Sequence, residues 1–268
     1  MKLLTIQDIS CYGQCSITVA LPILSHYGVE TAILPSAILS THTSGFQNFT
    51  VHDLTDEMPK IIDHWIKERI QYDAVYTGYI GNAKQFQDVI ACKEKLLKPN
   101  GLLFVDPAMA DHGKLYPGLG EDIIEGMKSI SSIADYILPN ITEACFLTGI
   151  PYQEEQTDEF IQHLLQQLLA LGAKNVILTG VIKQNQIGAI FYNGKESVTV
   201  TKNIIPQNYH GTGDIFSSII IAHILNHKSM EETLDIATDF ICNAILQTMP
   251  DSQHSYGVKF EEILNHSK

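Results

Sequence analysis

The sequence predicts an α/β fold, in which a mostly parallel sheet carries helices on both faces and a small antiparallel hairpin at one edge. Short apolar runs of strand length alternate with segments of helical apolar spacing along the 268 residues. Asn193-Gly194, a pair typical of hairpin turns, separates two strand-like runs late in the chain. No internal repeat, low-complexity tract or long linker interrupts this alternation. We therefore expect one domain spanning residues 1–268.

In the first half of the chain, apolar runs ending at polar or turn residues predict strands at Lys2–Gln7, Val29–Leu34, Ala74–Tyr76 and Leu102–Val105. Helical spacing of apolar residues, followed by Gly28, predicts a helix over Gln14–Tyr27. A second helix is expected over Pro59–Ile70. A third is expected to open with a capping box of Asn82 and Gln85, to reach about Leu97 and to precede a turn at Pro99–Gly101.

The second half continues the same alternation. We expect strands at Asp135–Leu138 and Asn175–Leu178, and a hairpin formed by Ile187–Tyr192 and Ser197–Thr201. Three helices are expected, at Thr157–Leu171, from Gly211 to about Leu225, and at Met230–Thr248.

Composition excludes several classes of function. The chain has 17 Lys+Arg and 30 Asp+Glu, a net charge of −13, which argues against binding nucleic acid or an anionic membrane. The basic residues are 16 Lys and one Arg, Arg69. Arginine clamps are therefore almost unavailable, and phosphate would be held by backbone N–H groups, lysine or a metal ion.

The sequence also indicates the compartment. Its first ten residues lack a signal-peptide pattern, and no uncharged apolar stretch reaches the length of about 18 residues that a membrane span needs. Cys11 and Cys15 lie four apart, but no second pair completes a zinc site. We interpret the five cysteines as reduced thiols and expect the protein in the cytoplasm.

Ligands of parallel α/β sheets bind beyond the carboxyl ends of the strands. This rule selects six segments of the chain: Asp8–Ser10, Ser40–Thr43, Thr77–Gly81, Asp106–Asp111, Asn140–Glu143 and Thr179-Gly180.

Gly211-Thr212-Gly213-Asp214 opens an apolar helix. Two glycines two residues apart allow backbone N–H groups to converge at the positive end of the helix, which suits phosphate. Asp214 could accept a proton from an attacking hydroxyl. The alternative is an ordinary helix N-terminus.

Acidic and amide side chains mark two further strand ends. Asn140 and Glu143 suit a magnesium ion held through water, although their spacing is also that of a capping box. Asp106 and Asp111 could shape a metal and phosphate site, or form a solvated exit from a strand.

The loop Ser40-Thr41-His42-Thr43-Ser44-Gly45 is rich in hydroxyl groups and contains one imidazole. It could bind a small polar ring or could be a plain polar loop. His210 adjoins the glycine loop, and its role stays open. Taken together, the glycine loop, the Asn140 and Glu143 pair and the acidic strand end at Asp106 indicate phosphoryl transfer. Neither a P-loop motif nor a Gly-x-Gly-x-x-Gly after the first strand is present.

The order of these motifs resembles that of the ribokinase superfamily, and more narrowly its pyridoxal/pyridoxamine kinase branch. Gly-Thr-Gly-Asp with Asn-x-x-Glu is specific for the superfamily, whereas Ser-x-His-Thr and Thr-Gly-Tyr carry the branch assignment less specifically. The matching stretches run from the first strand to the start of the last third: Gln7–Gly13, Leu39–Thr43, Tyr76–Gly81, Val105–Met109, Leu138–Glu143, Leu178–Gly180 and His210–Asp214.

The resemblance implies a three-layer αβα sandwich in which ATP and a pyridoxal-type vitamin meet above the strand ends. Members of the branch are commonly homodimers, and several respond to K⁺. The residues it assigns to the vitamin are Ser10, His42, Thr43 and Tyr79. Those it assigns to Mg²⁺ and ATP are Asp106, Asn140 and Glu143, with Asp111 nearby and Thr179 and Gly180 at phosphate or ribose. Gly211, Thr212 and Gly213 would form the anion hole, and Asp214 would be the base.

The chain departs from the family pattern at two places. Ala108 and Ala110 stand where many members have Asp-Pro-Val-Met-Gly-Asp, and the Gly-Asn pair that often follows the first strand is absent. Two alternatives to a pyridoxal-type kinase therefore stay open. One is a hydroxymethylpyrimidine kinase of thiamine synthesis on the same scaffold, and the other is a vitamin- or nucleotide-binding protein without turnover.

Overall fold

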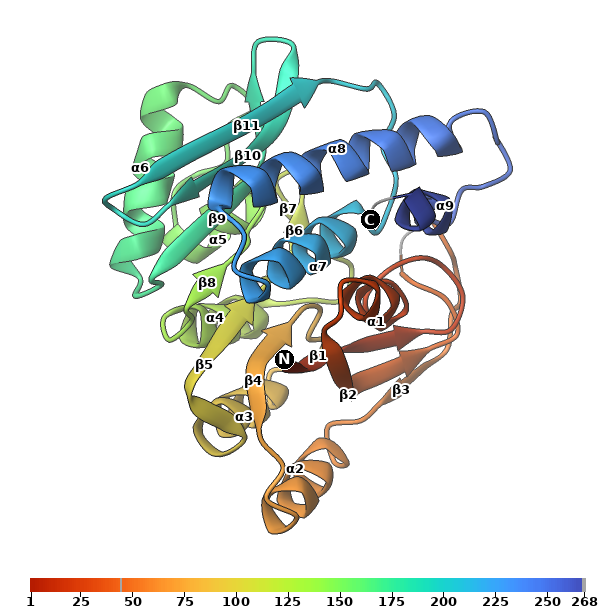
Figure 1. Cartoon of the computed structure of the whole chain (residues 1–268), viewed down its shortest axis with the longest axis vertical. Helices are drawn as coiled ribbons and strands as arrows, with labels where there is room; N and C mark the ends of the chain where they lie inside the picture. The colour runs from red at the N-terminus through yellow and green to blue at the C-terminus, as the bar shows by residue number, and fades with distance from the viewer. Residues whose placement is uncertain (44, 267–268) are drawn as a thin grey trace.

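A single large sheet organises the computed structural model, which describes residues 1–43 and 45–266. Within those residues nine strands pair in the order β11-β10-β9-β8-β5-β4-β1-β2-β3 (Figure 1). The central strands are parallel, whereas β3 at one edge and β10 and β11 at the other are antiparallel to their neighbours. The strands are β1 (Lys2–Ser10), β2 (Glu30–Leu39), β3 (Val51–Asp53), β4 (Tyr72–Thr77), β5 (Leu97–Val105), β8 (Tyr136–Ile137), β9 (Asn175–Lys183), β10 (Gln186–Tyr192) and β11 (Ser197–Asn203).

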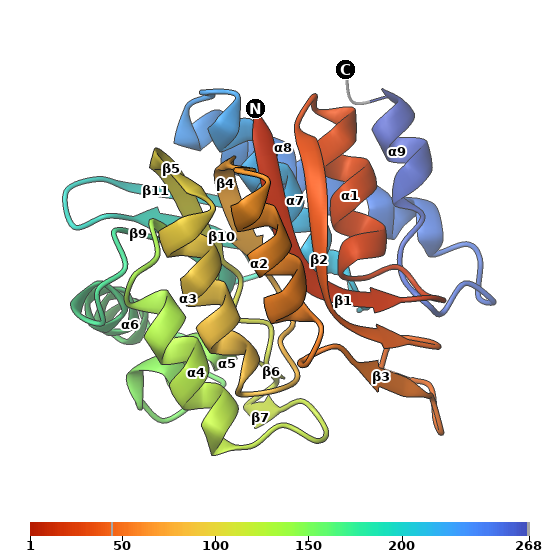
Figure 2. The ribbon, with the colours of Figure 1, turned by 90° about the horizontal axis from the view of Figure 1, so that it is seen from below.

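Helices cover both faces of the sheet, and each face has its own apolar core (Figure 2). The helices of one layer are α2 (Met58–Lys67), α3 (Gln85–Lys95), α4 (Glu121–Ser131), α5 (Ile141–Thr148) and α6 (Asp158–Ala170). Those of the other layer are α1 (Ile17–His26), α7 (Thr212–Leu225), α8 (Met230–Thr248) and α9 (Phe260–His266). The predicted three-layer αβα sandwich is therefore confirmed. In the described part of the chain, no helix is both long and apolar enough to cross a membrane.

Burial explains the apolar character of the central elements. β1 is covered on both faces, so its residues form an almost continuous buried run instead of an alternating one. α7 packs against α1, α8 and the sheet, and its run Ile219–Ile221 is wholly buried. A helix enclosed in this way is apolar around its whole circumference.

Several local predictions need correction. The capping box of Asn82 and Gln85 is wrong: α3 begins after Lys84, and the Gln85 side chain donates instead to the backbone oxygen of Ser36, at 2.8 Å. Pro99–Gly101 is not a free turn, because β5 starts at Leu97 and the pairing with β4 skips from Leu97 to Leu102.

Several predicted strand ends also move. β2 runs to Leu39 instead of Leu34. β1 continues past Asp8 to Ser10, because an irregularity between Gln7 and Ile9 lets its pairing with β2 resume. β9 continues past Thr179 to Lys183, because β10 pairs with it on both sides of Gly180, which is skipped in the register and has a φ of +71°. The predicted hairpin of β10 and β11 is confirmed.

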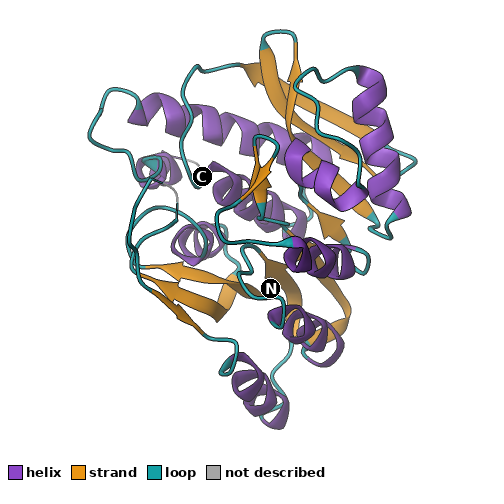
Figure 3. Cartoon of the chain, turned by 180° about the vertical axis from the view of Figure 1, so that it is seen from behind, coloured by secondary structure: helices purple, strands orange, loops and turns teal. Residues whose placement is uncertain are grey.

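The strand order creates the place where a ligand can bind. β1 lies between β2 and β4, so the chain leaves β1 toward one side of the sheet and later continues on the other. Such a switch point opens a crevice at the carboxyl ends of the strands. A small hairpin of β6 (Ala110–Asp111) and β7 (Lys114–Leu115) projects from the loop that follows β5 at this end (Figure 3).

Candidate active site

One cleft of about 690 Å³ lies beyond the carboxyl ends of the parallel strands. The structure brings every residue that the sequence assigned to a site to the lining of this cleft. These residues are Ser10, His42, Thr43, Tyr79, Asp106, Asp111, Asn140, Glu143, Thr179, Gly180, Gly211, Thr212, Gly213 and Asp214. Ser44 of the predicted hydroxyl-rich loop lies outside the described residues.

The start of α7 forms one wall of the cleft. Gly211 caps the helix with a φ of +79°, and a Cβ added to it would lie 1.8 Å from the backbone oxygen of Gln14. Only glycine satisfies both constraints. A Cβ added to Gly213, in contrast, meets no atom within 4 Å, so the space beside this residue is open to a ligand.

Asp214 stands in the first turn of α7 and is partly exposed to the cleft. Its Oδ2 accepts a hydrogen bond from the Ser16 backbone N–H at 3.0 Å. Burial, with a smaller contribution from the charge of Asp8, raises the pKa of Asp214 to about 6. A carboxyl group with a pKa near neutrality suits a general base.

Asp106, at the end of β5, faces the start of α7. Its Oδ2 accepts a hydrogen bond from Ser217 Oγ at 2.7 Å, which ties the strand end to the second turn of the helix. Burial and then the charge of Asp214 raise the pKa of Asp106 to about 7. The helix start and the acidic strand end therefore form two walls of one cleft.

Asn140 and Glu143 form the capping box of α5, as one interpretation of their spacing predicted. Asn140 Oδ1 accepts from the Glu143 N–H at 2.9 Å, and Glu143 Oε2 accepts from the Asn140 N–H at 2.8 Å. The same side chains hold the loop after Asp106: Glu143 Oε1 accepts from the Met109 N–H, and Asn140 Nδ2 donates to the Ala110 oxygen. Capping and a place in the cleft are thus compatible.

The charge of the cleft decides how it can receive phosphate. Among the lining residues that the structure describes there are five carboxyl groups and neither lysine nor arginine: Asp8, Asp106, Asp111, Glu143 and Asp214. Burial and then Asp106 raise the pKa of Glu143. No group of three His, Cys, Asp or Glu suited to a metal ion occurs in residues 1–43 and 45–266. The donor set fits a divalent cation that arrives with phosphate oxygens and is held by Asp106 and Glu143.

Ser10, Tyr79 and His42 bring polar side chains to the lining of the same cleft. Ser10 Oγ donates to Asp8 Oδ2 at 2.8 Å, and Asp8 itself is only 3% exposed. Burial and the charge of Asp8 raise the pKa of Tyr79. Burial and then His210 lower the pKa of His42, whose ring centroid lies 5.5 Å from that of His210. These side chains suit a small polar ring with hydrogen-bonding substituents.

Asp8 belongs to the segment Asp8–Ser10 that the sequence selected, but the sequence reasoning assigned it no role. A carboxylate within an apolar strand was the available signal, but it was interpreted as the end of that strand. Cys15 also lines the cleft, and burial, with Asp214 and Asp8, raises its pKa to about 12. Its thiol is therefore neutral and weakly nucleophilic.

Ala108 and Ala110, where the sequence departs from the family pattern, fit the local backbone. Ala110 lies in strand β6 and is absent from the residues with positive φ, so this position does not require glycine. Asp111 follows it with a side chain that is 56% exposed at the rim, and its Oδ1 accepts from the His112 N–H at 2.8 Å.

Sequence comparison assigns the chain that forms this cleft to a family. The profile of the family described as phosphomethylpyrimidine kinase matches residues 21–259. The chain belongs to this family. It is a kinase, a phosphotransferase with an alcohol acceptor, so the alternative of a binding protein without turnover does not hold. The resemblance to the ribokinase superfamily is confirmed as well.

Two similar solved structures superpose on almost the whole chain. A Bacteroides thetaiotaomicron structure described as a phosphomethylpyrimidine kinase, in a crystal form with pyridoxal, is 36% identical, has a TM-score of 0.94 and covers 99% of this chain and 95% of its own. Pyridoxal kinase from Lactobacillus plantarum is 30% identical, with a TM-score of 0.91 and coverage of 99% and 96%.

A third relative is named for a pyrimidine substrate. Hydroxymethylpyrimidine/phosphomethylpyrimidine kinase from Haemophilus influenzae is 28% identical over 253 residues, which are 91% of this chain and 90% of that protein. The relatives thus divide between kinases named for a pyridine and kinases named for a pyrimidine.

Proposed function

We propose that this kinase transfers the γ-phosphoryl group of ATP to the 5′-hydroxymethyl group of pyridoxal, pyridoxamine or pyridoxine, forming pyridoxal 5′-phosphate or its analogues. The observation that carries the proposal is Asp214, a carboxyl group with a pKa of about 6 at the start of α7, in a cleft that Ser10, His42 and Tyr79 also line. The pyridoxal in the Bacteroides thetaiotaomicron structure supports a pyridoxal-type acceptor.

In the proposed reaction the acceptor hydroxyl attacks the γ-phosphorus of ATP in line, and Asp214 takes the hydroxyl proton. The Ser16 N–H holds one oxygen of Asp214, which leaves the other oxygen to face the acceptor. Backbone N–H groups of residues 211–213 stabilise the charge on the transferring phosphoryl oxygens. Ser10, His42, Thr43 and Tyr79 orient the ring.

Magnesium enters this proposal together with ATP. Asp106 and Glu143 would hold the ion, which would neutralise phosphate charge in a cleft that has no described lysine or arginine in its lining. Asn140 would act by fixing Glu143. Activation by K⁺ and a homodimer are proposed from the resemblance alone. A single kinase domain over residues 1–268 and action in the cytoplasm are proposed from the sequence pattern and composition.

Hydroxymethylpyrimidine is the second candidate acceptor. The match to the phosphomethylpyrimidine kinase profile and the Haemophilus influenzae relative favour it. Ser40–Thr43 and Tyr79 belong to the motifs that favour a pyridine.

A substrate panel tests the proposal. ADP release is measured with pyridoxal, pyridoxamine, pyridoxine and hydroxymethylpyrimidine in parallel, with ATP and Mg²⁺ in excess. We expect the highest kcat/KM with one of the three pyridines. A higher kcat/KM with hydroxymethylpyrimidine would transfer the assignment to the second candidate, and ATP turnover with none of the four would refute both.

A further inference from the structure

Gln14, in the loop between β1 and α1, joins the C-terminal segment of the chain to the start of α7. We infer that Gln14 is a positioning residue, through which the C-terminal segment (residues 249–261) holds Asp214 and Gly211 in register with the acceptor. The inference rests on the proposed function, because it takes Asp214 as the base.

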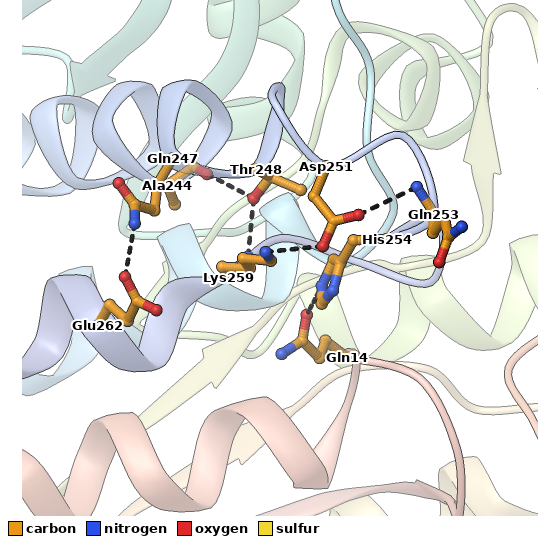
Figure 4. Close-up of polar contacts among 9 residues, drawn as sticks. All are labelled: Gln14, Ala244, Gln247, Thr248, Asp251, Gln253, His254, Lys259 and Glu262. Atoms are coloured by element: carbon orange, nitrogen blue, oxygen red, sulfur yellow. Dashed lines mark hydrogen bonds and ion pairs between the residues drawn. The ribbon is translucent and has the colours of Figure 1, made fainter.

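The C-terminal segment binds nearly all the polar groups of Gln14. Its backbone N–H donates to the Tyr256 oxygen at 2.9 Å, and its Nε2 donates to Glu261 Oε1 at 2.8 Å. Its Oε1 lies 3.1 Å from His254 Nε2 and accepts from the tautomer protonated there (Figure 4). Gly257 makes the close approach possible, since a Cβ at that position would lie 2.5 Å from Gln14 Cβ.

The remaining polar group of Gln14 is its backbone oxygen, which lies against Gly211 at the start of α7. It fills the space where a Cβ of Gly211 would be, 1.8 Å away. Two residues further along, the Ser16 N–H donates to Asp214 Oδ2. A shift of Gln14 would therefore reach the capping glycine and the base together.

The C-terminal segment is itself well braced (Figure 4). Asp251 pairs with Lys259 at 2.8 Å and also accepts from the Gln253 N–H at 3.1 Å. The Lys259 N–H donates to Oγ1 of the fully buried Thr248, at 2.8 Å. Val258 is fully buried in the core, so the segment forms a fixed support for Gln14.

Loss of the contacts between Gln14 and the C-terminal segment should change the pKa of Asp214, which ordinary destabilisation of the fold would not do. The hydrogen bond from Ser16 lowers the pKa of Asp214, against the effect of burial. The carboxyl groups of Asp8 and Asp106 face Asp214 as well, as do the Cys15 thiol and the hydroxyl groups of Tyr76 and Tyr116. The two carboxyl groups cannot replace the lost donor, and the described hydrogen bonds to the Asp214 carboxylate come from the Ser16 N–H. Releasing the loop should therefore raise the pKa of Asp214 and move the acidic limb of kcat/KM to higher pH.

Gln247, also drawn in Figure 4, serves as a matched control. Gln247 on α8 donates through Nε2 to Glu262, the neighbour of Glu261, but has no contact with the loop of Gln14. We expect Gln14→Ala to lower kcat by about 10- to 100-fold with little change in the KM for the acceptor, as a small misplacement of reacting groups does. The acidic limb should move upward in Gln14→Ala, whereas Gln247→Ala should leave kcat and the pH profile unchanged.

A paired exchange guards against a merely structural explanation. Gln14→Glu places two carboxylates together and should lower kcat, and adding Glu261→Gln should restore it by exchanging donor and acceptor. If Gln14→Ala does not fold, Glu261→Ala against Glu262→Ala makes the same comparison on the partner side. Equal kcat and equal pH profiles within either matched pair would overturn the inference.

Failure of the proposed function gives a different result. Wild-type protein that phosphorylates none of the four alcohols refutes the proposed function alone. The positioning role is then measured in the protein without ligand, by ¹³C NMR titration of the Asp214 carboxyl group. A higher pKa in Gln14→Ala than in Gln247→Ala supports the inference, and equal values overturn it.

Discussion

Replacing Asp214 by Asn tests the base and the cause of its raised pKa in one variant. Asn keeps the shape of the side chain and an oxygen that can accept from the Ser16 N–H, but it cannot take a proton. Loss of a general base lowers the rate by about 10²–10⁴-fold. We therefore expect kcat to fall by that factor in a coupled assay of ADP release, with the KM for ATP and for the acceptor largely kept.

The same change should stabilise the protein at alkaline pH. The pKa of Asp214 is about 6 in the folded chain against an ordinary value of 3.8. A difference of about two units at 1.36 kcal/mol each gives an upper limit of about 3 kcal/mol, which partial exposure to the cleft reduces to about 1–2 kcal/mol. The pKa of Asp214 is higher in the folded than in the unfolded chain, so ionising this group lowers the free energy of unfolding. This loss is absent below about pH 4 and complete only above about pH 6.

Urea unfolding at pH 4 and pH 8 measures this difference. We expect Asp214→Asn to have a larger free energy of unfolding than the wild type at pH 8 and an equal one at pH 4. A variant with near-normal kcat would remove Asp214 from the catalytic role. A variant no more stable than the wild type at pH 8 would refute burial as the cause of the raised pKa.

Three further predictions concern the same cleft. Gly213→Ala should fold with an unchanged Tm but bind ATP more weakly in calorimetry, whereas Gly211→Ala should lose several degrees of Tm because its Cβ would strike the Gln14 oxygen; equal Tm losses would contradict this. Asp8→Asn removes a buried charge that raises the pKa of Asp214, so the acidic limb of kcat/KM should move to lower pH; an unmoved limb would exclude the coupling. Excess EDTA should abolish ADP release and Mg²⁺ should restore it, because the described lining of the cleft offers no lysine or arginine; turnover without a divalent ion would contradict that reasoning.

Local signals in the sequence were sufficient for much of the fold. The start of α7 at Gly211 and the hairpin at Asn193 depend on backbone preferences of a few neighbouring residues, and both are as predicted. The capping box at Asn140 was one of two interpretations, and it is present. The apparent capping box at Asn82 failed because the Gln85 side chain has a partner 49 residues away, which local spacing does not encode.

Some residues of the site could likewise be predicted from the sequence, and others could not. Strand ends could be located from the sequence, so the segments that line the cleft could be named in advance. The role of Asp8 could not be predicted, and neither could the part played by Gln14 and the C-terminal segment. These roles come from contacts such as those of Ser16 with Asp214, 198 residues apart, and of Gln14 with His254, 240 residues apart.

Periodicity and turn chemistry act over a few residues, so the sequence was enough to predict most of the parallel strands, the edge hairpin, the acidity of the chain and the residues that stand at strand ends. It did not predict β3, β6, β7, α4, α5 or α9. Only the tertiary structure decided which carboxyl groups are buried beside one another, and hence the pKa values of Asp106 and Asp214. Those values depend on distance and desolvation, which exist only once the sheet has brought distant segments together.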